Sequence, residues 1–199
     1  MVDHLAAAGL RHWDPAMRQL AARALGALVP AAPLATRSHM TTGLVDALVA
    51  ATADVSLEVR DGAVWGLAEL VAALPRHGNA IDTIDDNNRS RVDNGGVALD
   101  AERQRAVAAV PGQLQAAHFL AGKGGETLRV AACHFIASSS RIGVALDGAT
   151  AATWLEVVES SLTHPAPPVQ QAATQALPCL VMCVGNGLCV AFVAFLAGC

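Results

Sequence analysis

A repeating helical segment is the feature that most restricts how this chain can fold. Residues 12–30 read HWDPAMRQLAARALGALVP, which places apolar side chains at helical spacing between a Trp-Asp-Pro corner and a closing proline. One order of residue types occurs four times: an apolar residue, Arg or Gln, two positions, Ala, three positions, then Leu or Ile. The copies begin at Met17, Val59, Leu128 and Val169. The Ala at the fifth position of each copy predicts close contact between helices.

The spacing of the copies predicts the architecture. Arg18 and Arg60 are 42 residues apart, and Arg129 and Gln170 are 41 residues apart. The 69 residues from Arg60 to Arg129 equal one such period plus about 27 residues, judged against the roughly 40–47 residues of HEAT and armadillo units. The surplus coincides with a polar stretch rich in Asn, Asp and Gly, residues 79–99, which we expect to be a flexible insertion.

A second set of helices is expected between these copies. Apolar residues recur at helical spacing in 41–52, where Thr42 is a candidate N-cap, and in 148–162. Residues 100–120 predict a longer helix, bent or split at Pro111. Helix pairs of this kind predict an all-α fold, a HEAT/armadillo-type α-solenoid of about four helix-pair repeats. The repeats are expected near residues 1–30, 40–75, 100–140 and 148–180.

The two ends of the chain differ from the expected repeats. Neither end carries the polar capping repeat that such arrays need, so we expect this chain to be a segment of a longer one. Residues 181–199 form an apolar tail that contains cysteines and lacks the repeat pattern. The uninterrupted apolar part of this tail is shorter than the ~20 residues that span a bilayer.

Composition narrows the classes of partner and compartment. The chain has 53% hydrophobic residues and a formal net charge of -4, without a cluster of Lys and Arg. This balance argues against nucleic acid as the main partner and against an anionic membrane surface. The five cysteines are odd in number, and we find no secretory signal at the N-terminus. We therefore expect a cytoplasmic protein.

The motifs of common catalytic and metal sites are missing from the sequence. Gly122-Lys123 lacks the upstream Gly and the following Ser or Thr of a phosphate-binding loop. Cys179 and Cys183 are four residues apart rather than three, and the adjacent Cys133 and His134 point to different faces of a helix. We therefore expect no cofactor, no metal site and no catalytic residue, and we interpret the chain as non-enzymatic.

The recurring arginines are the strongest candidates for a functional or structural role. Arg18, Arg60 and Arg129 occupy the same position in three copies. In one interpretation they form a ladder, in which each Arg bridges an acidic cap on its own or the next repeat. In the other they line a concave groove and bind an acidic partner surface. Asp14 and Asp54 are the expected acidic caps, because each precedes a helix by one turn.

The three tryptophans are expected to lie mainly in the core. They are Trp13, Trp65 and Trp154. An exposed Trp on the concave face would instead be a candidate hot spot for binding a partner, because buried aromatic anchors dominate many interfaces. Trp13 is therefore retained as a candidate partner-binding residue together with Asp14 and the recurring arginines.

The first two copies carry a resemblance to a known family. HWDPAMRQLAARAL, followed one period later by DVSLEVRDGAVWGLAELVAAL, resembles the middle region of the tubulin-folding cofactor D family, also called tubulin-specific chaperone D. The similarity extends over about residues 1–180 and is weak through the insertion. The residues that carry it are His12, Trp13, Asp14, Arg18, Leu20, Ala21, Ala24 and Leu25 in the first copy, and Arg60, Gly62 and Ala63 in the second.

The resemblance implies a function in the cytoplasm, at the microtubule cytoskeleton. Members of the family are solenoids that bind β-tubulin and act with other tubulin-folding cofactors to assemble the α/β-tubulin heterodimer. They stimulate GTP hydrolysis by tubulin and associate with an Arf-like small GTPase. Two alternatives come from other classes. One is a generic HEAT-repeat adaptor without a tubulin role. The other is a metal-binding HEAT-repeat enzyme, which would need paired His-Glu motifs that this sequence lacks.

Overall fold

The computed structural model describes residues 1–74 and 99–197, with side chains described up to residue 184. Within these ranges the fold is all-α, and no strand is present. The predicted insertion at 79–99 lies outside the described residues, apart from Leu99, which is buried.

Most of the helices follow one another through short connections; the exception is the step from α5 to α6, which includes residues outside the described ranges. The N-terminal part contains α1 (Val2–His4), the π-helical segment η1 (Leu5–Gly9), α2 (Pro15–Ala31), α3 (Leu34–His39), a second π-helical segment η2 (Met40–Leu44), α4 (Val45–Ala51) and α5 (Leu57–Ala72). The C-terminal part contains α6 (Ala101–Ala116), α7 (Gly125–Ile142), α8 (Gly148–Leu162) and α9 (Pro167–Ala197). The backbone of the apolar tail continues α9 as far as residue 197.

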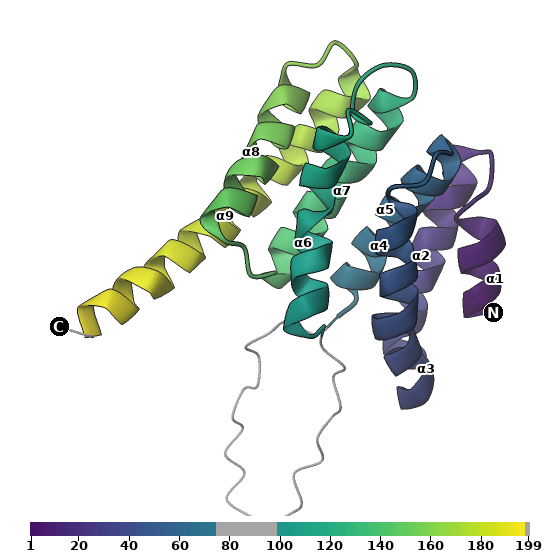
Figure 1. Ribbon diagram of the computed structural model, residues 1–199, viewed down its shortest axis with the longest axis horizontal. Helices are drawn as coiled ribbons and strands as arrows, with labels where there is room; N and C mark the ends of the chain where they lie inside the picture. The colour runs from purple at the N-terminus through teal and green to yellow at the C-terminus, as the bar shows by residue number, and fades with distance from the viewer. Residues whose placement is uncertain (75–98, 198–199) are drawn as a thin grey trace, which may run out of the picture.

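The helices lie in two layers that alternate along the chain (Figure 1). In the first layer α2 packs against α5, α5 against α7, and α7 against α9. In the second layer α4 packs against α6 and α6 against α8, while α4 and α8 also cover α5 and α9. Helices that are neighbours within the first layer are therefore separated in sequence by one helix of the second layer.

Small residues allow the first layer to pack closely. The Ala at the fifth position of each sequence copy is buried, as the pattern predicts; these are Ala21, Ala63, Ala132 and Ala173. Gly62 is the tightest contact, because a Cβ atom placed there would lie 1.7 Å from the Leu10 carbonyl oxygen. At this position only hydrogen fits between α5 and the end of the N-terminal helix.

The start of α2 agrees with the sequence prediction, and the start of α5 differs from it. Asp14 caps α2 by accepting from the Ala16 N–H at 2.8 Å, and Pro15 occupies the first helical position. Asp147 caps α8 in a similar way. The prediction for Asp54 is wrong, because Ser56 is the N-cap of α5 and Asp54 accepts from the Ser56 N–H at 2.8 Å. Asp54 therefore orders the turn that precedes the cap.

Two other local predictions also differ from the structure. Thr42 does not cap a helix, since α3, η2 and α4 run on without a break and its hydroxyl donates to the Ser38 carbonyl at 2.8 Å. Pro111 does not split its helix, because α6 continues through it to Ala116. A proline within a helix removes one backbone hydrogen bond, and burial of Pro111 in the packed layer offsets that loss.

Two of the three tryptophans lie in the core and one does not. Trp154 is fully buried, its indole N–H donates to the Ala108 carbonyl at 2.8 Å, and its ring meets Phe135 edge-on at 6.0 Å. Trp65 is 9% exposed. Trp13 is 78% exposed, so its predicted core position is wrong. It occupies the turn before α2, where the side chain points away from the packed layer and has the His12 ring as an aromatic neighbour.

Candidate functional site

The turns before α2, α5 and α9 have the same local structure, and we call them corners 1, 2 and 3. They comprise residues 12–14, 54–56 and 164–166. In each corner the first side chain accepts a hydrogen bond from the backbone N–H two residues later. The bonds are Asp14 N–H to His12 Nδ1 (3.1 Å), Ser56 N–H to Asp54 Oδ1 (2.8 Å) and Ala166 N–H to His164 Nδ1 (3.2 Å).

A second hydrogen bond, shared by the three corners, ties each corner to the helix that follows it. The side chain six residues after the corner begins donates back to the first carbonyl of the corner, and the two arginines also reach the second carbonyl. These bonds are Arg18 to His12 (2.7 Å) and Trp13 (3.0 Å), Arg60 to Asp54 (2.6 Å) and Val55 (2.9 Å), and Gln170 to His164 (2.8 Å). The recurring Arg or Gln of the sequence pattern thus binds backbone carbonyls.

The third copy of the pattern, which begins at Leu128, departs from this arrangement. Arg129 donates through Nε to the Leu120 carbonyl at 2.8 Å, and through Nη1 to the hydroxyls of Ser160 and Ser161. The turn before α7 contains Gly122 and Gly124 at φ of 71° and 85°, a conformation that the other corners do not use. Arg129 therefore links α7 to α8 instead of holding a corner.

Arg18 also forms a buried ion pair between α2 and α5. Its Nε donates to Asp61 Oδ2 at 2.7 Å, and the two side chains are 3% and 0% exposed. Burial raises the pKa of the Asp61 carboxyl, and the Arg18 hydrogen bond and charge oppose that rise. Asp61 Oδ1 has no hydrogen-bond partner in the described part of the chain. The pair is therefore a structural contact with no access to an outside ligand.

These contacts correct the predicted arginine ladder. The acid that meets Arg18 is Asp61 of the next first-layer helix, not an acidic cap. Arg60 meets no acid in the described residues; its guanidinium lies over the Phe119 ring at 4.0 Å. Arg129 binds one carbonyl and two hydroxyls. Each of the three arginines donates hydrogen bonds to groups of the protein itself and so serves as an internal brace. Trp13 is the most exposed of the predicted site residues.

A row of side chains on α5 was missed by the sequence reasoning. Asp61, Trp65 and Glu69 are four residues apart and so lie on one face of the helix. The Trp65 ring lies 4.5 Å from the His134 ring of α7, centroid to centroid, and His134 Nε2 lies 2.9 Å from Glu69 Oε1. His134 and Glu69 are 31% and 21% exposed, whereas their neighbour Cys133 is buried. The row thus joins α2, α5 and α7.

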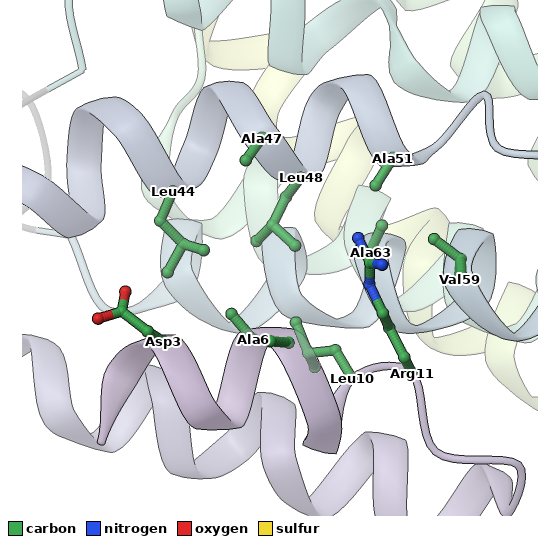
Figure 2. A pocket seen from close by; sticks show the side chains of 11 residues that line it. Asp3, Ala6, Leu10, Arg11, Leu44, Ala47, Leu48, Ala51, Val59 and Ala63 are labelled. Atoms are coloured by element: carbon green, nitrogen blue, oxygen red, sulfur yellow. The ribbon is translucent and has the colours of Figure 1, made fainter.

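An apolar groove of about 290 Å³ lies between the N-terminal helix and α4, with α5 as its floor. Figure 2 shows the side chains that line it, with Asp3 toward one end and Arg11 toward the other. Alanine and leucine side chains make up most of the walls. Asp3 lies 3.4 Å from His39, and both side chains are largely exposed. The groove can accept a small apolar group but brings no catalytic pair together.

Comparison with known proteins adds no assignment to these sites. No known protein family has a profile that matches the chain, and no solved structure matches it. Among the described residues, no three His, Cys, Asp or Glu side chains lie where they could share a metal ion. No helix in the described ranges has the length and apolar character needed to cross a membrane.

Proposed function

We propose that the chain is a scaffold of the HEAT/armadillo type, built from about four helix-pair repeats. The observation that carries this proposal is the recurrence of one corner, with the same two hydrogen bonds, before α2, α5 and α9. The alternation of the helices between two layers supports it as well. Recurring units of similar local structure, each in contact with its neighbours, are typical of such arrays.

We further propose that the scaffold binds β-tubulin, as the tubulin-folding cofactor D family does, and assists assembly of the α/β-tubulin heterodimer. Corner 1 supports this step, because each of its three residues has a distinct role. His12 and Asp14 accept backbone hydrogen bonds, while Trp13 stays 78% exposed. An exposed Trp on a braced turn is a suitable anchor for a protein partner, since its ring loses little conformational freedom on binding.

The mechanism that follows is scaffolding without catalysis by this chain. The arginines hold the corners in place, and the surface they brace holds the tubulin subunit. Stimulation of tubulin GTP hydrolysis would then act on the bound tubulin, together with the other tubulin-folding cofactors. An Arf-like small GTPase is a further proposed partner, and the proposed location is the cytoplasm, at the microtubule cytoskeleton.

Retention of purified tubulin by the immobilised protein tests this function. We expect Trp13→Ala to weaken binding about 30-fold, the effect of losing a hot spot worth ~2 kcal/mol. Val55→Ala is the matched control, because Val55 occupies the equivalent position in corner 2 and is 96% exposed. It should leave binding unchanged. Circular dichroism should show that both variants keep the helical content of the unaltered protein.

A generic adaptor without a tubulin role is the second candidate. The corner geometry supports an adaptor as well as it supports a tubulin scaffold, because the side chains that hold the corners bind groups of the protein itself. If the folded, unaltered protein retains no tubulin, the tubulin proposal is rejected and the adaptor function stands. If tubulin is retained equally by the Trp13 variant, the proposed role of corner 1 is rejected.

A further inference from the structure

Helix α2 has apolar side chains on two opposite faces. One face is buried against α5 and η1, as expected for a packed helix. On the opposite face apolar residues recur at alternating spacings of four and three residues, which places them in one line along the helix. This line, which we call the α2 seam, consists of Met17, Leu20, Ala24, Ala27 and Ala31. Met17 is 44% exposed and Leu20 is 57% exposed.

The position of α2 explains why no described helix covers its seam. In the first layer α5 and α7 each have a neighbouring helix on both sides, whereas among the described residues α2 has a first-layer neighbour, α5, on one side only (Figure 1). Alternating spacing of three and four is the pattern by which one helix packs against another along its length. The exposed Trp13 ring stands directly before the seam. The seam therefore has the form of a helix-binding surface.

Charge selects the kind of helix that fits. The sequence has no Asp or Glu between Asp14 and Asp46. Three arginines lie in this stretch; Arg18 is buried with Asp61, and Arg37 donates to backbone carbonyls. Arg23 is exposed and makes no side-chain hydrogen bond or ion pair within the described part of the chain. The seam is thus bordered by one available guanidinium and by no carboxylate from α2 or α3.

The same charge argues against a second copy of this chain as the occupant. A two-fold axis through the middle of the seam, near Ala24, would bring the Arg23 side chains of both copies together. Like charges at such short range destabilise a helix pair. We propose that the α2 seam binds an amphipathic helix of a partner protein, apolar on the face it buries and acidic where it meets Arg23.

Fluorescence anisotropy with two synthetic labelled peptides tests this proposal. Both peptides are helical and carry Leu and Ala on one face; the flanking positions are Glu in the first and Lys in the second. The first should bind the unaltered protein at least about tenfold more tightly than the second. Arg23→Glu should reverse this preference. Leu20→Gln should weaken binding of the Glu peptide about tenfold or more.

Leu155→Gln is the matched control, since Leu155 is an exposed leucine on α8. This variant should bind the Glu peptide as the unaltered protein does. The proposal is overturned if neither peptide binds, if the two bind equally, or if Leu20→Gln has no effect. It is also overturned if sedimentation equilibrium shows a dimer that Leu20→Gln dissociates, because a second copy then occupies the seam.

Discussion

One face of α5 carries two acidic side chains that meet basic partners at similar distances but in different surroundings. Toward α2, Asp61 meets Arg18 at 2.7 Å, and the side chains are 0% and 3% exposed. Toward α7, Glu69 lies 2.9 Å from His134, and the side chains are 21% and 31% exposed. The acids are eight residues apart on one side of the helix. We therefore expect exposure, more than distance, to separate a contact that holds two helices together from one that adds little.

The physical reason is the environment of each charge. A fully buried charge that loses its partner remains unsolvated, and this penalty is several kcal/mol. A partly exposed charge that loses its partner is solvated by water instead, so the net loss is small. The two side-chain pairs of α5 should therefore respond very differently to removal of one charged group.

The largest effect is expected for Arg18→Met. This substitution keeps much of the side-chain volume but leaves Asp61 buried without its cation, and it also removes the braces on corner 1. We expect the free energy of unfolding to fall by about 3–5 kcal/mol. Urea denaturation followed by circular dichroism measures the change. Arg23→Met on the exposed side of α2 is the control and should stay within about 0.5 kcal/mol.

A double variant separates the effect of the unpaired Asp61 charge from the effect of losing the hydrogen bonds between Arg18 and corner 1. Arg18→Met with Asp61→Leu replaces the buried pair by apolar side chains, so no unpaired charge remains. It should be more stable than Arg18→Met alone. If the two are equally unstable, the loss arises from corner 1 and the buried charge is not the cause.

A much smaller effect is expected for the second pair on α5, Glu69 with His134. Glu69→Gln keeps the shape of the side chain and a hydrogen-bonding oxygen near His134, and removes the negative charge. The free energy of unfolding should change by less than about 1 kcal/mol. The same urea titration measures it. If Glu69→Gln lowers the free energy of unfolding as much as Arg18→Met does, exposure does not explain a difference between the two pairs.

The pH dependence of two aspartates sharpens the comparison further. Burial raises the pKa of Asp61 above 3.8, whereas hydrogen bonds from the Thr150 N–H lower the pKa of the exposed cap Asp147 below 3.8. The folded state thus holds the Asp61 proton more tightly than the unfolded state does. The contribution of Asp61 to stability must therefore fall as pH rises from 3.8 through the folded pKa.

The contribution of Asp147 to stability changes with pH in the opposite direction. Its contribution is present above 3.8 and is lost as pH falls through its lowered folded pKa. Carboxyl chemical shifts measured by NMR during an acid titration should place the midpoint of Asp61 above that of Asp147. Asp61→Asn should remove the first titration, and Asp147→Ser should remove the second while keeping a cap. A midpoint for Asp61 below 3.8 would show that Arg18 outweighs burial.

Much of the fold could be predicted because it depends on local patterns. The helices at 15–31 and 148–162 follow from apolar spacing and from capping by Asp14 and Asp147, which involve residues within a few positions. Burial of the fifth-position alanines followed from the same spacing. The prediction for Thr42 failed and α6 is not split at Pro111, because packing against other helices outweighed the local preference of one residue.

The site was harder to predict because its contacts join distant parts of the chain. The sequence pattern singled out Arg18 and Arg60, but Arg18 pairs with an acid 43 residues away and Arg60 lies over Phe119. The four-residue spacing of Asp61, Trp65 and Glu69 was visible in the sequence and could have indicated one polar face. Nothing local indicated that His134 would meet that face.

By itself, the sequence determined where most helices form and that small residues bring them together, since both depend on neighbours within one or two turns. Only the tertiary structure decided which tryptophans are exposed. Trp13 and Trp65 are the same residue type near similar repeats, yet one is 78% exposed and the other 9%. The reason is physical: exposure depends on which helix lies alongside, and α5 has neighbours on both sides whereas the α2 seam has none among the described residues.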